Sequence, residues 1–127
     1  MRFLGIDYGQ KRVGIAVSDS EGKFAFAKAV FPNNNNLLES IKKVCDEQKI
    51  GTIVIGDSKN FKGEPNDIMK KIEPFKKELE NKIGLPVFFE PEFYSSAEAE
   101  RIQGRNEMLD ASAAAIILQS FLDKQKT

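Results

Sequence analysis

The stretch that decides the fold is Met1–Asp19, with the sequence MRFLGIDYGQKRVGIAVSD. Two apolar runs, Phe3–Ile6 and Val13–Val17, flank a tight turn and predict a pair of antiparallel strands. The first strand delivers a carboxylate, Asp7, at the edge of an apolar core, which suggests a role beyond packing. Three glycines in this stretch leave the backbone open, so a charged ligand could approach it closely.

The length and composition bound the class of protein. A chain of 127 residues fits a single domain over residues 1–127 and is long enough for a hydrophobic core. A hydrophobic content of 41% with 30% charged residues is ordinary for a soluble globular protein. No apolar run has the length of a membrane span and no secretory signal is evident, so we expect a cytoplasmic protein without a membrane partner.

The residue types that are missing exclude several kinds of chemistry. The chain has no histidine, which excludes histidine general bases, Ser-His-Asp triads and histidine metal sites. Cys45 is the single cysteine, so neither a disulfide framework nor a multi-thiolate zinc site is available. Catalysis would have to use carboxylates, amines, hydroxyls or a bound metal ion.

Charge is unevenly distributed along a chain whose net charge is zero. A neutral total argues against nucleic-acid binding by bulk electrostatics, although it permits a local basic patch. The C-terminal third carries acids without matching bases, and these would repel one another unless a divalent cation binds between them. The ordinary alternative is that each carboxylate is solvated by water. The acids are Glu90, Glu92, Glu98, Glu100, Glu107 and Asp110, against Arg101 and Arg105.

Hydrophobic periodicity and turn residues predict the remaining elements. We expect Asn36 to cap the first helix, a kink or break at Pro74 in the second, and a capping box at Ser95–Glu98 before a short third helix. Four phenylalanines, at positions 24, 26, 88 and 89, are predicted to lie in the core. The predicted strands are Phe24–Phe31, Thr52–Ile55 and Pro86–Phe89, and the helices are Leu37–Gln48, Pro65–Ile83, Ala99–Ile102 and Leu109–Leu122.

This order predicts an α/β domain, in which a five-stranded mixed sheet is flanked by helices. The first three strands form an antiparallel meander, and the last two extend the sheet in parallel. Because the carboxyl ends of such strands converge, acids placed there could share one site. The candidates are Asp7, Asp57, Glu92 and Asp110, and carboxylates suit Mg²⁺ or Mn²⁺. Two such ions roughly 4 Å apart would support phosphodiester hydrolysis.

Three motifs, in matching order over essentially the whole chain, resemble those of the YqgF/RuvX family. The opening GIDYGQKRVGIAVSD is similar to the first motif of the family, and the ending LDASAAAIILQSFL is similar to the last. Between them, PEFYSSAEA occupies the place of D-E-R-x-T-T-x-x-A. The resemblance puts Asp7, Glu92 and Asp110 on the catalytic acids and Ser95 and Ser96 on the hydroxyl pair.

The resemblance implies a ribonuclease H-like core and a nuclease acting on branched DNA, as in Holliday junction resolution, or on the 5′ end of pre-16S ribosomal RNA. The middle motif departs from the family, with Pro91 in place of aspartate and Phe93 in place of arginine. The basic stretch before the final acid is reduced to Arg105, opposed by Glu107. These departures affect the grip on the substrate more than metal binding.

The resulting hypothesis is a metal-dependent phosphodiesterase site. Asp7 would bridge two ions, while Glu92 and Asp110 would complete one each, with Asp57 as a possible substitute ligand. Lys11, Arg12, Ser95 and Arg105 would contact nucleic acid. Each residue also has an ordinary interpretation: Asp7 and Asp57 as turn residues, Asp110 at a helix N-terminus, Glu92 as a solvated loop acid, and Lys11 and Arg12 as surface charges.

Two other classes of function stay open on the sequence. One is a nucleic-acid-binding or ribosome-assembly factor that does not cut its ligand. The other is a nucleotide-binding ATPase module, for which the chain is short. Symmetric cutting of a four-way junction would require a homodimer.

Overall fold

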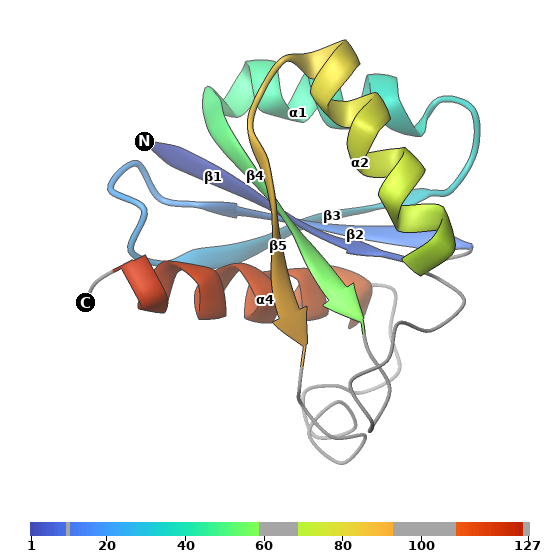
Figure 1. Ribbon diagram of the computed structural model, residues 1–127. Helices are drawn as coiled ribbons and strands as arrows, with labels where there is room; N and C mark the ends of the chain where they lie inside the picture. Colours follow the sequence, from blue (N-terminus) through green and yellow to red (C-terminus); the bar gives the residue numbers. More distant parts are fainter. Residues whose placement is uncertain (10, 59–68, 93–108, 126–127) are drawn as a thin grey trace.

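The computed structural model describes residues 1–9, 11–58, 69–92 and 109–125 (Figure 1). Within these ranges, the side chains at 57, 58, 69–71, 91, 92, 109, 110 and 125 are not described. The strands are β1 (Arg2–Tyr8), β2 (Arg12–Ser18), β3 (Ala25–Pro32), β4 (Ile50–Ser58) and β5 (Val87–Glu92). The helices are α1 (Leu37–Gln48), α2 (Met69–Ile83) and α4 (Leu109–Gln125).

The strands form one sheet in the order β3-β2-β1-β4-β5. β1 pairs antiparallel with β2, and β2 pairs antiparallel with β3, which is the predicted meander. On its other side β1 pairs parallel with β4, and β4 pairs parallel with β5. The predicted mixed sheet is therefore confirmed, and β1 lies at its centre.

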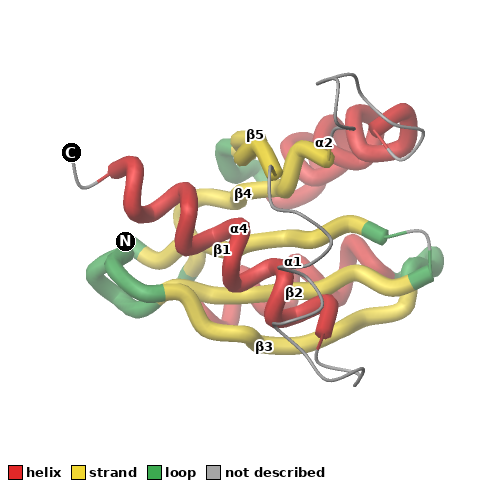
Figure 2. Tube along the Cα trace, turned by 90° about the horizontal axis from the view of Figure 1, so that it is seen from below, coloured by secondary structure: helices red, strands yellow, loops and turns green. Residues whose placement is uncertain are grey.

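Helices cover both faces of the sheet, with α1 and α2 on one face and α4 on the other (Figures 1 and 2). Because side chains alternate along a strand, even-numbered residues of β1 face α1 and α2 while odd-numbered residues face α4. Leu4 and Ile6 pack in the larger core cluster, together with Ile41 of α1 and Leu79 of α2. The α4 face is packed by small and branched residues: Ala16, Val54, Ala114, Ile117, Leu118 and Leu122.

Two local predictions about the helices need correction. Asn36 does occupy the N-cap position of α1, but its side chain makes no capping hydrogen bond; its own N–H donates to Asn34 Oδ1 at 2.9 Å. Of the kink or break expected at Pro74, the break is wrong, because α2 runs through this residue, and the kink stays a prediction. Pro74 is exposed, and the neighbouring Ile72 and Phe75 are buried against the sheet, so packing offsets the lost backbone bond. The capping box and the short helix lie outside the described residues.

The prediction that phenylalanines fill the core is mostly wrong. Phe24, Phe26 and Phe88 are 57%, 55% and 49% exposed, whereas Phe89 is partly buried against the larger core cluster as expected. The exposed rings lie on or beside β3 and β5, the two edge strands of the sheet. Residue type therefore does not decide their exposure: Phe88 and Phe89 are neighbours on the same edge strand, and only Phe89 packs against the larger core cluster.

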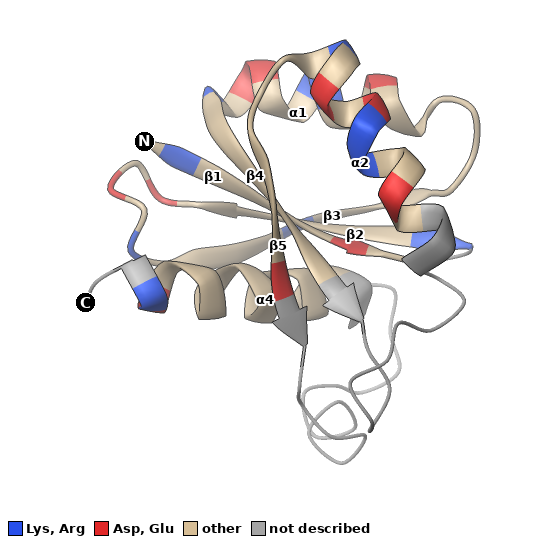
Figure 3. Cartoon of the chain, viewed as in Figure 1, with Lys and Arg blue, Asp and Glu red and all other residues tan. Residues whose placement is uncertain are grey.

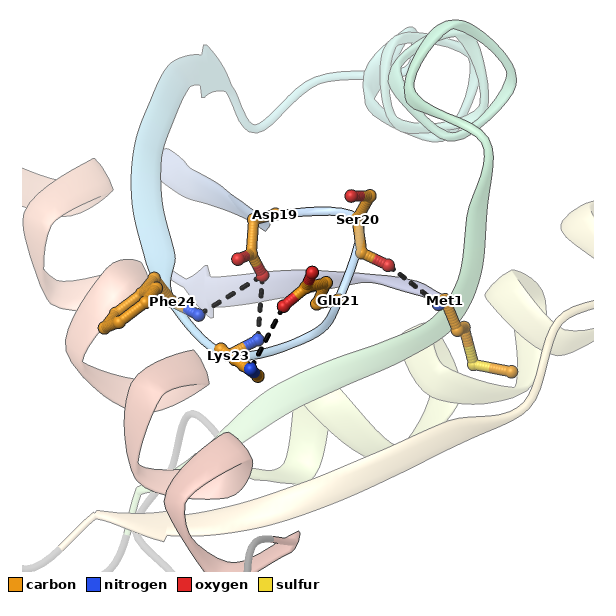
Figure 4. Close-up of polar contacts among 6 residues, drawn as sticks. All are labelled: Met1, Asp19, Ser20, Glu21, Lys23 and Phe24. Atoms are coloured by element: carbon orange, nitrogen blue, oxygen red, sulfur yellow. Dashed lines mark hydrogen bonds and ion pairs between the residues drawn. The ribbon is translucent and has the colours of Figure 1, made fainter.

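The turn between β2 and β3 is organised by one carboxylate (Figure 4). Asp19 Oδ1 accepts hydrogen bonds from the backbone N–H of Lys23 at 2.8 Å and of Phe24 at 3.3 Å. The terminal ammonium of Met1 donates to the carbonyl of Ser20 at 2.9 Å, which ties the start of β1 to the same turn. The Lys23 N–H bond is the main reason why the pKa of Asp19 is lowered from 3.8 in the folded protein, against a smaller opposing effect of burial.

Replacing Asp19 with asparagine is expected to lower the Tm at neutral pH and to have no effect in strong acid. Since the pKa of Asp19 is depressed on folding, its contribution to stability is complete above pH 3.8 and is lost as the pH falls through the folded-state pKa. The check is the Tm difference between parent and Asp19→Asn measured across acidic pH. Glu21→Gln, which removes an exposed ion pair with Lys23 in the same turn, is the control and should change the Tm little. A difference for Asp19→Asn that is constant with pH would contradict the assignment.

Candidate functional site at the carboxyl edge of the sheet

The carboxyl ends of the three parallel strands β1, β4 and β5 lie at the same end of the sheet. This carboxyl edge runs across the strand ends and is distinct from the outer strands of the sheet. Asp7 is the penultimate residue of β1 and is partly buried. Its neighbour Ile6 pairs with Ile55 of β4, and β4 continues to Ser58, which pairs with Glu92 at the end of β5. The backbones of Asp7, Asp57 and Glu92 therefore lie along one edge, as the sequence predicts. Glu92 belongs to β5, so its interpretation as a loop acid is wrong.

Helix α4 runs antiparallel to β1, which brings the start of the helix to the same edge. Near the other end, the Phe3 and Phe121 ring centroids are 5.9 Å apart. Further along β1, Gly5 lies against Ala114 and Leu118. Asp110 precedes Ala114 by four residues, about one helical turn. The start of α4 thus lies towards the end of β1 that carries Asp7, as the run of the helix along the sheet in Figure 1 shows.

The strand register separates the candidate acids by face. Gly5, Val54 and Phe88 are aligned across the three strands and lie on the face that α4 covers. By alternation, position 7 of β1 and position 92 of β5 belong to this same face. Position 57 belongs to the opposite face, with Ile53 and Ile55. Positions 7 and 92 therefore share the face that α4 covers, whereas position 57 does not.

The side chains of Asp57, Glu92 and Asp110 are outside the description, and so are Ser95 and Arg105 as whole residues. Among the side chains that are described, no group of three acidic, histidine or cysteine residues could hold a metal ion. Lys11 and Arg12 are exposed at the turn between β1 and β2, beside the edge. The roles of all these residues stay predictions.

Glu90 is a buried carboxylate that sequence reasoning placed among acids without a matching base, and the structure corrects this. Its residue is 2% exposed, and its Oε2 accepts from Ser120 Oγ at 2.8 Å and from Lys124 Nζ at 2.7 Å. Both partners are on α4, so Glu90 fixes the last turns of this helix on β5. Figure 3 shows that the described part of α4 carries charged residues only near its C-terminal end. Glu90 therefore has a structural role.

Removing Lys124, whose ion-pair partner is buried, is expected to destabilise the protein more than removing a lysine whose ion-pair partner is exposed. Lys124→Met would leave the Glu90 carboxylate buried beside Ser120 alone, and breaking a buried pair costs about 3–5 kcal/mol. Because Lys124 is 60% exposed, water screens part of this, and we expect a loss of about 2 kcal/mol in the free energy of unfolding. The measurement is urea unfolding, with Lys23→Met as the control for an exposed pair. Equal losses in the two variants would contradict a structural role for the Glu90–Lys124 pair.

The single cysteine takes no part in chemistry at this edge. Cys45 is buried in α1, and burial, with a smaller effect of Asp46, raises the pKa of its thiol to about 12. The thiol is therefore protonated and poorly nucleophilic at neutral pH. This agrees with the expectation that the chain uses oxygen and nitrogen groups.

None of the helices in the described part of the chain is long and apolar enough to span a membrane.

Known proteins resemble this chain in fold over its whole length. The solved structure of RuvC from Thermus thermophilus has a TM-score of 0.66 at 15% sequence identity, covering 100% of this chain and 98% of that one. A resolvase from Fowlpox virus, solved with its substrate Holliday junction DNA, has a TM-score of 0.63 at 12% identity and covers 100% of both chains. At these identities the likeness concerns the fold, and the predicted ribonuclease H-like fold is confirmed.

Sequence similarity reaches further than the fold. A curated protein from Burkholderia ambifaria, named "Putative pre-16S rRNA nuclease", is 36% identical over 131 residues, which cover 95% of this chain and 88% of that protein. Residues 1–124 match the profile of a family described as RuvX: Holliday junction resolvase. The opening and ending motifs, and the strand β1 that carries Asp7, lie inside this match. The chain therefore belongs to the RuvX family.

Proposed function

We propose that this protein is an endonuclease, dependent on Mg²⁺ or Mn²⁺, that hydrolyses phosphodiester bonds of structured nucleic acid. One observation carries the proposal: the carboxyl ends of three parallel strands and the start of α4 lie at the same end of the sheet as Asp7. Membership of the RuvX family supports the reaction class. Curated relatives about one third identical to this chain are named after pre-16S rRNA. This favours precursor 16S rRNA over junction DNA as the substrate.

The donor set at this edge fits a hard divalent cation. Asp7, Glu92 and Asp110 offer carboxylate oxygens, and the chain contains no histidine that could select a softer metal. Asp57 is the weaker candidate, since its position falls on the face opposite α4. We infer that Asp7, Glu92 and Asp110 hold the metal, which when bound would activate a water and stabilise the leaving oxygen.

The neighbouring turn supplies positive charge for the substrate. Lys11 and Arg12 are exposed immediately after the strand that carries Asp7, so their side chains can neutralise backbone phosphates next to the scissile bond. Ser95 and Arg105 are proposed as further phosphate contacts. Such contacts position the strand without reading its sequence, which suits a substrate recognised by shape.

The test is a cleavage assay with titrated Mg²⁺ or Mn²⁺ on two substrates, a four-way DNA junction and a precursor 16S rRNA fragment. Cleavage of the RNA that requires metal supports the proposal. Strong binding in a gel shift with no cleavage in either metal would instead identify a non-catalytic binding or assembly factor. Preferential, symmetric cutting of the junction would point to DNA and to a homodimer with two sites.

A further inference from the structure

A cavity of about 250 Å³ lies beside the carboxyl end of β1, on the face opposite α4. It is open to solvent on one side and is lined by Tyr8, by the loop before α1, by the start of α1 and by α2. Tyr8 follows Asp7 directly, so their Cα atoms are about 3.8 Å apart while their side chains lie on opposite faces of the strand. The cavity therefore opens at the edge that carries the candidate site, without sharing its acids.

Part of the lining of the cavity is apolar and aromatic, although the lining as a whole is more polar than apolar. The ring centroids of Tyr8 and Phe75 are 4.7 Å apart, and Phe75 is 7% exposed. Leu37, at the start of α1, is buried as well and contributes to the lining. The two rings are inclined by 43°, so the aromatic surface offered to a ligand is mainly that of Tyr8, on which a planar ligand could stack or pack.

The rim of the cavity is polar, and its position is fixed. Asn33 donates through Nδ2 to the Gly9 carbonyl at 2.8 Å and through its backbone N–H to the Lys11 carbonyl at 2.9 Å. These bonds hold the loop against the turn between β1 and β2. Asn34, Asn35 and Glu78 of α2 also line the cavity, and the amide oxygen of Asn34 already accepts a hydrogen bond from the Asn36 N–H at 2.9 Å. Amides provide donors and acceptors together, as the edge of a nucleobase requires.

The charged residues in and beside the cavity favour the base of a nucleotide in the cavity and its phosphate outside it. Glu78 at the rim would repel a phosphate from the cavity, while it can accept a hydrogen bond from an amino group of a base. The exposed Lys11 and Arg12 lie on the turn that Asn33 is bonded to, and these side chains attract phosphate. The volume is below the range of about 300–1,000 Å³ typical of drug-sized ligands, and it suits one heterocycle.

We propose that this cavity binds a single unpaired nucleobase of the strand whose backbone lies at Asp7. The inference rests on the proposed function for the strand at Asp7, and it deepens that function by naming the substrate feature: a nucleotide that is bulged or single-stranded next to the cleavage position. A fully paired base could not leave its stack to enter the cavity without an added cost of unpairing.

The experiment measures binding and not cleavage, so the failure of one proposal can be told from the failure of the other. A fluorescent RNA hairpin carries one unpaired nucleotide, and its partner probe has an abasic sugar at that position. Dissociation constants are measured without divalent metal, for the full chain and for Leu38→Trp, whose indole would fill the cavity beside α1. Leu38→Met conserves the volume and serves as the matched control.

For the parent and for Leu38→Met, we expect the base-bearing probe to bind about tenfold more tightly than the abasic probe, which is within the range for stacking of one base. For Leu38→Trp, this ratio should fall to near one, while binding of the abasic probe should not change because the phosphate contacts remain. Equal binding of both probes by the parent, or an unchanged ratio in Leu38→Trp, would overturn the proposal. A free mononucleotide that binds as tightly as the hairpin would overturn it too, since the ligand would then be the nucleotide alone. If the ratio is as expected but no nucleic acid is cut, the cavity stands and the nuclease proposal fails.

Discussion

The variant Asp7→Asn is expected to lose metal-dependent cleavage almost completely, with a rate reduced roughly a thousandfold. Asparagine has the shape of aspartate but lacks the charge that holds a divalent cation, and metal ions at such sites contribute several kcal/mol of transition-state stabilisation. The measurement is single-turnover cleavage of the precursor 16S rRNA fragment at saturating Mg²⁺. The Tm without metal should stay the same or rise, because removing one of several gathered carboxylates relieves repulsion.

The matched control for this result is Asp46→Asn, the same chemical change at an exposed residue of α1. It should cleave like the parent, which separates the effect of position from that of net charge. Binding of the RNA by Asp7→Asn should be nearly unchanged without metal, since Lys11 and Arg12 remain. If Asp7→Asn cleaves as fast as the parent, the site lies elsewhere on the molecule.

The sequence was sufficient for the centre of the sheet because several local signals there agree. Leu4, Ile6, Val13 and Ile15 are all fully buried, as the apolar runs predict. Helix α1 has the predicted bounds, Leu37–Gln48, since its apolar residues recur at helical spacing. At these positions propensity, periodicity and burial favour the same structure, so no long-range information was needed.

The predictions failed where distant parts of the chain decide the outcome. Nothing near Phe26 or Phe88 indicates that their strands lie at the edges of the sheet, which leaves both rings exposed. Glu90 finds its cation on Lys124, 34 residues away, across a helix–sheet contact. Likewise, β5 extends through Pro91, because an edge strand tolerates a residue that cannot donate a ladder bond.

The candidate site was predictable only in part, because its geometry also depends on the pairing of strands that are distant in the sequence. The motif around Asp7 predicts an acid at a strand end, and β1 places its backbone there. A choice between Glu92 and Asp57 depends on which face each position occupies, and this follows only from the register of β4 against β5. One residue of register decides the face, and the sequence carries no direct record of it.

The second large effect is expected from Gly5→Ala, which should lower both stability and activity. A Cβ at this position would lie 2.7 Å from Leu118 Cβ and 3.0 Å from the carbonyl oxygen of Ala114, and neither atom can move without moving α4. Overpacking of this kind costs about 1–3 kcal/mol, and we expect about 3 kcal/mol because one contact is to backbone. Urea unfolding provides the measurement.

The activity of folded Gly5→Ala tests whether the contact between β1 and α4 also sets the geometry of the site. Asp7 lies two residues from Gly5 on β1, and Asp110 lies about one turn from Ala114 on α4. A displacement of α4 by about 1 Å would therefore change the relation between these two acids, which can cost about a hundredfold in rate. Cleavage should be measured well below the Tm of the variant.

Gly51→Ala is the matched control for Gly5→Ala, because it makes the same substitution in a parallel strand of the same sheet. The added Cβ would meet Met1 Cγ at 2.9 Å, but Met1 is 71% exposed and its flexible side chain can move aside. We expect Gly51→Ala to change the free energy of unfolding by about 1 kcal/mol or less and to cleave like the parent. If Gly5→Ala behaves in the same way, then β1 and α4 are not in the close contact that brings Asp7 and Asp110 to one edge, and the three-acid site loses its structural basis.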